Sequence, residues 1–149
     1  MRQKRGVATV PALVLATVLG VFAGTSVYTF HYAKGSSYLG DDPATCANCH
    51  VMASHLDGWL RGPHHAAATC NDCHTPSTPV RKYVVKALNG WHHSKAFTTG
   101  NYPDAIQLRP SSREVVEGQC RTCHADMLAA VDADGVSCIR CHESVGHLR

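Results

Sequence analysis

Four pentapeptides of the form Cys-x-x-Cys-His carry the recognisable chemistry of this 149-residue chain. They use every cysteine, in the pairs Cys46 and Cys49, Cys70 and Cys73, Cys120 and Cys123, and Cys138 and Cys141. Two thiols at this spacing form thioether bonds with the vinyl groups of a haem, and the next residue presents its imidazole to the iron. The repeat therefore predicts four covalently bound c-type haems, with the motif histidines His50, His74, His124 and His142 as candidate iron ligands.

Two other uses of paired cysteines explain the pattern less well. Structural zinc sites also contain Cys-x-x-Cys pairs, but they do not require a histidine directly after each second cysteine. A disulfide framework would suit an even number of cysteines, yet it has no use for a histidine at the same offset in each copy. We therefore favour haem attachment over both.

The iron ligands cannot all come from the motifs, because four six-coordinate irons need eight. Seven further histidines are available, and at least two of them are expected to be distal ligands. These histidines are His31, His55, His64, His65, His92, His93 and His147, and the methionines Met52 and Met127 are possible thioether ligands. His65 and His147 each lie five residues from a motif, too close to reach the far face of that motif's own haem, so each would serve a neighbouring haem. Met52 would either ligate the first iron or pack against the haem.

A run without charged residues, from Val7 to Phe30, follows the basic residues Arg2, Lys4 and Arg5. As a helix, its 24 residues would reach about 36 Å, enough to cross a bilayer core of about 30 Å. A cleaved signal peptide has a shorter apolar core and a small-residue cleavage site. We therefore expect an uncleaved anchor in the cytoplasmic membrane, with the basic start in the cytoplasm and the haem motifs on the periplasmic side.

The remaining residues are enough for one domain, and aliphatic side chains are sparse in it. We expect a mainly α fold with much irregular structure, in which the haems supply most of the core, divided into an anchor at 1–33 and a haem domain at 34–149. The motifs start 24, 50 and 18 residues apart, which suggests two haem pairs. The balance of 14 basic and 11 acidic side chains is too even to indicate nucleic-acid binding.

Three local patterns lie outside the motifs. The apolar residues of 79–96 predict a short helix that breaks at Gly90. Ser111 followed by Glu114 resembles a capping box that starts a helix leading into the third motif. The segment 100–110 is expected to be a loop.

With these motifs in place, the chain resembles the tetrahaem quinol dehydrogenases of the NapC/NirT family, and within it the small subunits of cytochrome c nitrite reductase. The resemblance covers nearly the whole chain: the N-terminal anchor, 46–52, 65–74, 86–90 and 138–147. Proteins of this family oxidise menaquinol at the membrane surface and pass electrons to a periplasmic reductase. The resemblance therefore implies membrane lipid, menaquinol and a multihaem catalytic subunit as partners in a hetero-oligomer.

The resemblance also implies roles for single residues. Met52 rather than His50 would ligate the first iron, His74, His124 and His142 would be proximal ligands, and His65 and His147 would be distal ligands. A partner lysine fills one distal position in this subfamily. Lys86 would lie beside a quinol pocket, and His93 would either accept a quinol proton or ligate the iron.

Two competing functions remain open from the sequence. The chain could be a tethered electron-transfer cytochrome supplied by a separate quinol-oxidising subunit, or it could serve a different periplasmic reductase. A terminal nitrite reductase is less well supported. Enzymes that reduce nitrite in this way typically carry their catalytic haem on a Cys-x-x-Cys-Lys motif, and this motif is absent here.

Overall fold

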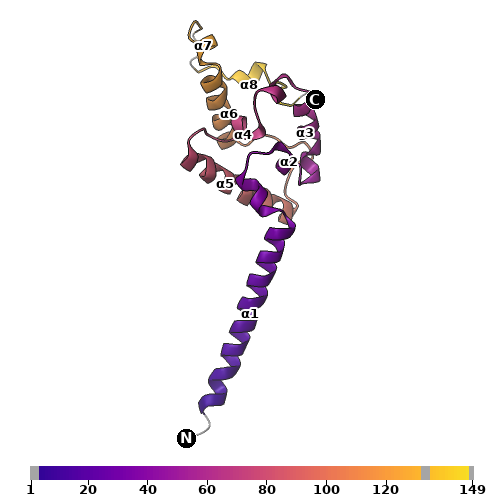
Figure 1. Ribbon diagram of the computed structural model, residues 1–149, viewed down its shortest axis with the longest axis vertical. Helices are drawn as coiled ribbons and strands as arrows, with labels where there is room; N and C mark the ends of the chain where they lie inside the picture. Colours follow the sequence, from indigo (N-terminus) through magenta and orange to yellow (C-terminus); the bar gives the residue numbers. More distant parts are fainter. Residues whose placement is uncertain (1–3, 132–134, 148–149) are drawn as a thin grey trace. The chain divides into compact units, whose positions relative to one another are not determined.

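The computed structural model describes residues 4–131 and 135–147, and side chains from residue 9 onward. The chain forms two compact units, Met1–Ser37 and Tyr38–Arg149. Of the expected basic start, Arg2 lies outside the described residues. All regular structure in the described residues is helical, which confirms the expected mainly α fold (Figure 1).

The first unit consists mainly of one long helix, α1 (Lys4–Tyr32). Its segment Thr9–Tyr32 is long and apolar enough to cross a membrane, with a mean hydropathy of 2.0. The hydroxyls of Thr17 and Thr25 donate to the carbonyls of Leu13 and Val21, so these polar groups are satisfied within the helix. The described side chains are exposed all around α1, and a helix that is apolar on every side needs a non-aqueous environment. This helix fits the expected membrane anchor.

The second unit is built from short helices and irregular connections. In chain order its elements are η1 (Gly35–Leu39), which starts at the end of the first unit, α2 (Pro43–Cys46), η2 (His50–Met52), α3 (Ala53–Leu60), η3 (Pro63–Ala66), α4 (Cys70–His74), α5 (Pro79–Thr99), α6 (Pro110–Cys123), α7 (Ala125–Leu128) and α8 (Cys138–Cys141). Only α5 and α6 exceed eight residues. The Cys-x-x-Cys-His motifs begin on or near the ends of α2, α4, α6 and α8.

The four motif helices contact one another in the order of the sequence. Helix α2 packs against α4, α4 packs against α6, and α6 packs against α8. The long connection between the second and third motifs does not hold them apart, because α4 and α6 are in contact despite 50 residues between the first cysteines of these motifs. The two haem pairs stay a prediction. Gln119 of α6 stabilises the contact between α4 and α6. Its amide donates to the carbonyl of Asp72 at 2.9 Å and to the hydroxyl of Ser77 at 3.1 Å.

Helix α5 is longer than the sequence predicted. It continues through Gly90 without interruption and ends only at Gly100, whose φ of 64° lies in the left-handed region that glycine adopts easily. A single glycine inside a helix costs about 1 kcal/mol relative to alanine, which the rest of a long helix can offset. The predicted break at Gly90 is therefore wrong.

Helix α6 begins at Pro110, one residue before the predicted cap Ser111. Proline at the first helical position needs no backbone donor, so it starts the helix without a side-chain cap. The loop prediction is confirmed for residues 101–109, which have no regular helix or strand.

Glu117 of α6 holds the start of α8. Its carboxylate accepts hydrogen bonds from the Ser137 hydroxyl at 2.5 Å and from the backbone N–H groups of Cys138 and Ile139 at 2.8 and 3.4 Å. Four residues further along α6, the guanidinium of Arg121 donates to the carbonyl of Val136 at 2.6 Å. The fourth motif is thus held by two side chains that project from the helix carrying the third.

The described residues of the second unit include no buried large apolar side chain. Its buried residues are Thr45, Gly58, Gly62 and Thr75, which are small. A polypeptide of this size normally needs an apolar core to offset the loss of conformational entropy on folding. A large apolar group from outside the polypeptide has to supply that core.

We predict that Glu117→Ala lowers the free energy of unfolding of the haem-loaded protein by about 1–2 kcal/mol, the range for a lost charged cap. Burial raises the pKa of Glu117, but the hydrogen bonds from Ser137 and Cys138 outweigh it, so the net pKa is lowered. The difference between wild type and variant should therefore be complete above the unfolded-state pKa of about 4.3 and shrink as pH falls through the lowered native value. Denaturant unfolding at pH 7 and pH 3 measures the loss of stability and its dependence on pH. Glu114→Ala, at an exposed position, is the control.

Candidate haem and quinol sites

Each motif places its two cysteines and its histidine on one helical turn or at a helix end. The second motif is the most regular, because α4 contains all of Cys70–His74. Asp72 stabilises the start of this helix, since its carboxylate accepts hydrogen bonds from the backbone N–H and the hydroxyl of Thr69 at 2.7 and 2.8 Å. In the third and fourth motifs, His124 and His142 directly follow α6 and α8.

The thiols of the first two motifs lie close together. Cys46 and Cys70 share a side-chain hydrogen bond, which lowers the pKa of Cys46 to about 7 and raises that of Cys70. Cys73 lies near enough to Cys123 for their charges to interact. The sulfur atoms thus follow the same order as the motif helices, from the first motif to the second and from the second to the third.

A group of imidazoles gathers around the second motif histidine. The ring centre of His147 lies 6.0 Å from that of His74 and 5.2 Å from that of His55. The Nδ1 of His147 lies 2.9 Å from the backbone carbonyl of His55, a hydrogen bond in which the ring donates. Burial, and then the charges of His147, His55 and His93, lower the pKa of His74 to about 4. His74 is therefore held in its neutral form at pH 7, the form that binds iron.

The third motif histidine has a different neighbour. The ring centres of His64 and His124 lie 6.1 Å apart, and the two planes are inclined at 76°. The Nδ1 atom of His64 is buried and has no hydrogen-bond partner among the described residues. His65, which the sequence singled out, instead contacts Trp59, with ring centres 5.4 Å apart. The adjacent histidines thus point to different neighbours.

The first and fourth motif histidines lack such a partner. Neither His50 nor His142 has an aromatic or imidazole ring contact among the described residues, and both side chains are exposed. Met52, in η2, is half-buried. The structure therefore brings His147 beside His74, but it does not bring His65 to a motif histidine.

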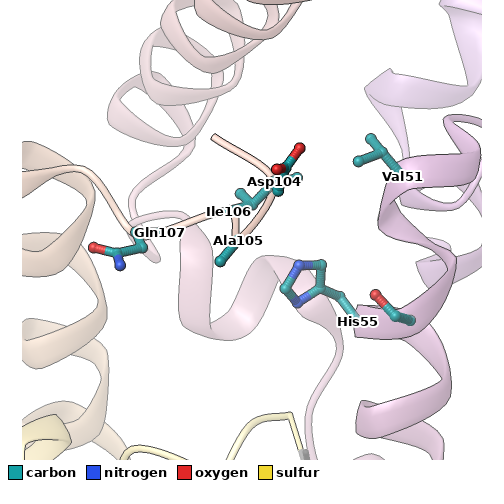
Figure 2. Close-up of a pocket in the computed structure, with 7 residues that line it drawn as sticks. Val51, His55, Asp104, Ala105, Ile106 and Gln107 are labelled. Carbon is teal, nitrogen blue, oxygen red and sulfur yellow. The ribbon is translucent and has the colours of Figure 1, made fainter. Parts of the chain in front are cut away.

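A pocket of about 330 Å³ lies next to the first motif. Figure 2 shows Val51 and His55 on one side of it and the loop that carries Asp104, Ala105 and Ile106 facing them. Val51 precedes Met52, so this pocket adjoins the first candidate haem site.

Lys86 of α5 is the centre of a hydrogen-bonded cluster. Its ammonium donates to the carbonyl of Gly40 at 2.5 Å, to the carboxylate of Asp41 at 3.1 Å and to the carbonyl of Tyr38 at 3.3 Å. Its side chain is only 13% exposed. Lys82 pairs with the other carboxylate oxygen of Asp41 at 2.6 Å. All three protons of the Lys86 ammonium are used, so Lys86 has to exchange one of these bonds before it can bind a quinol.

His93 lies two turns after Lys86 on the same side of α5, at an axial separation of about 10 Å. Desolvation, followed by the positive charges of His92 and Arg109, lowers the pKa of His93. Its ring keeps contact with solvent. His93 is thus a neutral base at pH 7 and belongs to the same electrostatic group as His74.

These observations fit a haem at each motif. The second unit lacks buried large apolar side chains among its described residues, so the macrocycles would provide the missing core. The buried, unpartnered nitrogen of His64 is a polar atom that an added group has to accommodate. No three or more His, Cys, Asp or Glu side chains in the described part of the chain gather into a site that could chelate a bare metal ion.

An N-terminal apolar helix and a small helical unit with four haem-attachment motifs define a membrane-associated multihaem cytochrome of the c type. A model of the NapC/NirT cytochrome c family, N-terminal region, matches residues 4–149. The chain belongs to this family, and membership implies covalently bound haem.

Three similar proteins support the assignment. The cytochrome c-type protein NrfH of Wolinella succinogenes is 36% identical over 91% of this chain and 82% of its own length. The cytochrome c nitrite reductase subunit NrfH of Nitratidesulfovibrio vulgaris is 31% identical over 99% of this chain and 90% of its own length. A crystal structure of a cytochrome c nitrite reductase NrfHA complex bound to the HQNO inhibitor matches with a TM-score of 0.67, at 28% identity over 93% of this chain and 90% of that chain.

Two residues of the site were missed from the sequence. Asp41 is an acidic residue in the irregular segment before α2, and nothing in its local pattern indicates that two lysines from 41 and 45 residues away converge on it. His64 was counted among the spare histidines, but two adjacent histidines give no sequence signal that separates a ligand from its neighbour. Only the ring contacts distinguish them.

We predict that Lys86→Met lowers the free energy of unfolding by about 1–3 kcal/mol, because it removes the hydrogen bonds of a charged donor to the Tyr38 carbonyl, the Gly40 carbonyl and the Asp41 carboxylate. Lys82→Met is the matched control and should cost less than about 1 kcal/mol, since it removes one partly exposed ion pair. Denaturant unfolding followed by haem absorbance measures both. Equal losses would show that the carbonyl contacts of Lys86 contribute little.

Proposed function

We propose that this chain is the membrane-anchored, electron-donating subunit of a nitrite reductase complex. It oxidises menaquinol and passes the electrons through four covalent haems to a catalytic subunit that reduces nitrite to ammonia. The observation that carries the proposal is the unbroken series α2, α4, α6 and α8, in a chain similar to a protein of the NrfHA complex. The series provides a path from one end of the haem domain to the other.

The haems supply one-electron chemistry when bound, and the polypeptide positions them. Each cysteine pair would anchor one haem. Two imidazoles bonded to opposite faces of one iron at about 2 Å each have ring centres about 6 Å apart. The pairs His74 with His147 and His124 with His64 have this separation, at 6.0 and 6.1 Å. We therefore assign His147 to the second haem and His64, in place of His65, to the third.

The His147 ring is oriented for this role. Its Nδ1 donates to the His55 carbonyl, which leaves Nε2 as the nitrogen available to the metal. His142 has no facing imidazole among the described residues, so a ligand from the catalytic subunit would complete the fourth haem. Such a shared ligand would make the hetero-oligomer obligatory for the final electron transfer. The family resemblance indicates that a partner lysine fills one distal position, without assigning it to a particular haem.

The first haem is the proposed electron acceptor from quinol. Met52 would ligate its iron, because a thioether raises the potential relative to imidazole and so favours electron uptake. The proposed quinol residues are Lys86, as the hydrogen-bond donor to a quinol oxygen, and His93, as the proton acceptor. Their common side of α5 supports this arrangement. Lys86 would exchange its weakest contact, the 3.3 Å bond to Tyr38, for the quinol oxygen.

The proposed orientation follows from the charge distribution. Arg2, Lys4 and Arg5 would remain in the cytoplasm, α1 would cross the inner membrane, and the haem domain would be periplasmic. We retain 1–33 and 34–149 as the anchor and the haem domain. Menaquinol would then reach the first haem from the membrane.

Direct quinol oxidation separates this proposal from a tethered electron-transfer cytochrome. The purified, haem-loaded chain alone should reduce its haems with a menaquinol analogue. His93→Leu should slow this reaction by about 10²-fold, the lower range for loss of a general base, while dithionite still reduces all the haems. Exposed His31→Leu is the control. Stopped-flow absorbance gives the rates, and failure of the wild-type chain to accept electrons from the analogue would reject the quinol dehydrogenase.

The assignment of His64 is tested by ligand loss. His64→Ala should convert one low-spin haem to high spin, because a distal imidazole is removed, whereas His65→Ala should leave the spin states unchanged. Electron paramagnetic resonance of the oxidised proteins measures the change. Intact mass should show four haems in both variants. A high-spin signal in His65→Ala alone would restore the assignment implied by the family resemblance.

A further inference from the structure

Helix α5 (Figure 1) carries four large apolar residues on one side, while Tyr83, Val85 and Phe97 lie elsewhere around it. With about 100° of rotation per residue, Val80, Val84, Leu88 and Trp91 fall within an arc of about 80°. These four side chains are 78%, 51%, 54% and 66% exposed. We call them the outer face of α5.

The opposite side of α5 contacts the protein through its lysines. Lys82, Lys86 and His93 fall within an arc of about 40° on that side, which also carries the exposed Phe97 near the end of the helix. The side chains of Lys82 and Lys86 are only 23% and 13% exposed, because both are bound to the segment 38–41. The helix is therefore inverted relative to a helix of a water-soluble protein, whose apolar side faces inward.

Charge indicates what covers the outer face. Helix α5 contains four lysines and arginines and no acidic residue. Two of these cations are exposed and form no ion pair with a described residue: Arg81, which lies beside the outer face, and Lys95, which lies within its arc one turn after Trp91. Exposed apolar residues with a tryptophan, flanked by unpaired cations, match the composition of helices that lie in the interface of an anionic bilayer.

The sequence keeps this helix within reach of a bilayer. The segment bound by Lys82 and Lys86 starts at Tyr38, six residues after Tyr32, where the candidate membrane span ends. Six residues of extended chain reach at most about 20 Å. A segment tethered so shortly to a membrane helix remains near the membrane surface.

We propose that the outer face of α5 inserts into the interface of an anionic phospholipid bilayer, as a second membrane contact besides α1. Val84, Leu88 and Trp91 would contact the acyl-chain boundary, and Arg81 and Lys95 would bind lipid phosphates. The inference does not depend on quinol oxidation. It also gives the inversion of α5 a physical reason, because lipid replaces water on the apolar side.

The test uses the full haem-loaded chain in vesicles of phosphatidylcholine with about a quarter phosphatidylglycerol. All eight native cysteines belong to haem motifs, so Val84→Cys and Leu88→Cys each provide a single free thiol. Ser111→Cys, at an exposed position on α6, is the matched control. Each variant is treated with a charged maleimide that cannot enter the bilayer and with an apolar maleimide that can. Intact mass measures both haem content and labelling.

We expect the charged reagent to label positions 84 and 88 at least about tenfold more slowly than position 111, because a thiol in the bilayer interface is shielded from water and poorly ionised. The apolar reagent should label all three positions. Omitting phosphatidylglycerol should reduce the protection about twofold or more, because the cations then lose their lipid counter-charges. Unchanged protection would overturn the preference for anionic lipid.

Three other results would overturn the proposal. Equal labelling of all three positions by the charged reagent would show that water covers the outer face. Protection of positions 84 and 88 from both reagents would show that a haem or the polypeptide covers it. Protection that develops only when a catalytic subunit is added would identify a protein interface.

Discussion

The lack of a polypeptide core is the constraint on which the rest of this structure depends. Among the described residues of the second unit, those that are buried are threonines and glycines, while the large apolar side chains are exposed or half-buried. Covalent attachment of haem meets this constraint, because the thioether bonds fix a large apolar group to the chain and it cannot dissociate. The short motif helices then have two tasks: they hold the sulfur atoms at the correct spacing, and they contact the next motif helix.

The features that could be predicted from the sequence are local ones. Haem attachment lies within single pentapeptides, and the anchor lies within one apolar run, so pattern and length were sufficient for both. The proposed distal ligands are different, because His64 and His147 are distinguished from the other spare histidines only by rings 60 and 73 residues away. The same reason applies to the contact of α4 with α6, since it spans a long connection whose path the motif spacing alone does not indicate.

Helix α5 shows why periodicity was a poor guide in this chain. The pattern of Val80, Val84, Leu88 and Trp91 is correct for an amphipathic helix, but the usual rule would place this side inward. Here Asp41 binds the opposite, cationic side through Lys82 and Lys86. Gly90 adds to the difficulty, because the helix continues through it. A Cβ atom at this position would meet no atom within 4 Å, so no close contact requires a glycine there.

The hydrogen bond from His147 to the His55 carbonyl joins the last described residue of the chain to a residue 92 positions earlier. Because ribosomes synthesise a protein from its N-terminus, His74 emerges long before the imidazole that lies beside it. The surroundings of His74 can thus be completed only after the segment that carries His147 has been synthesised, even though Cys70 and Cys73 are available earlier. A chain shortened by a few residues at its C-terminus would keep every attachment motif and still lack one wall of an internal site.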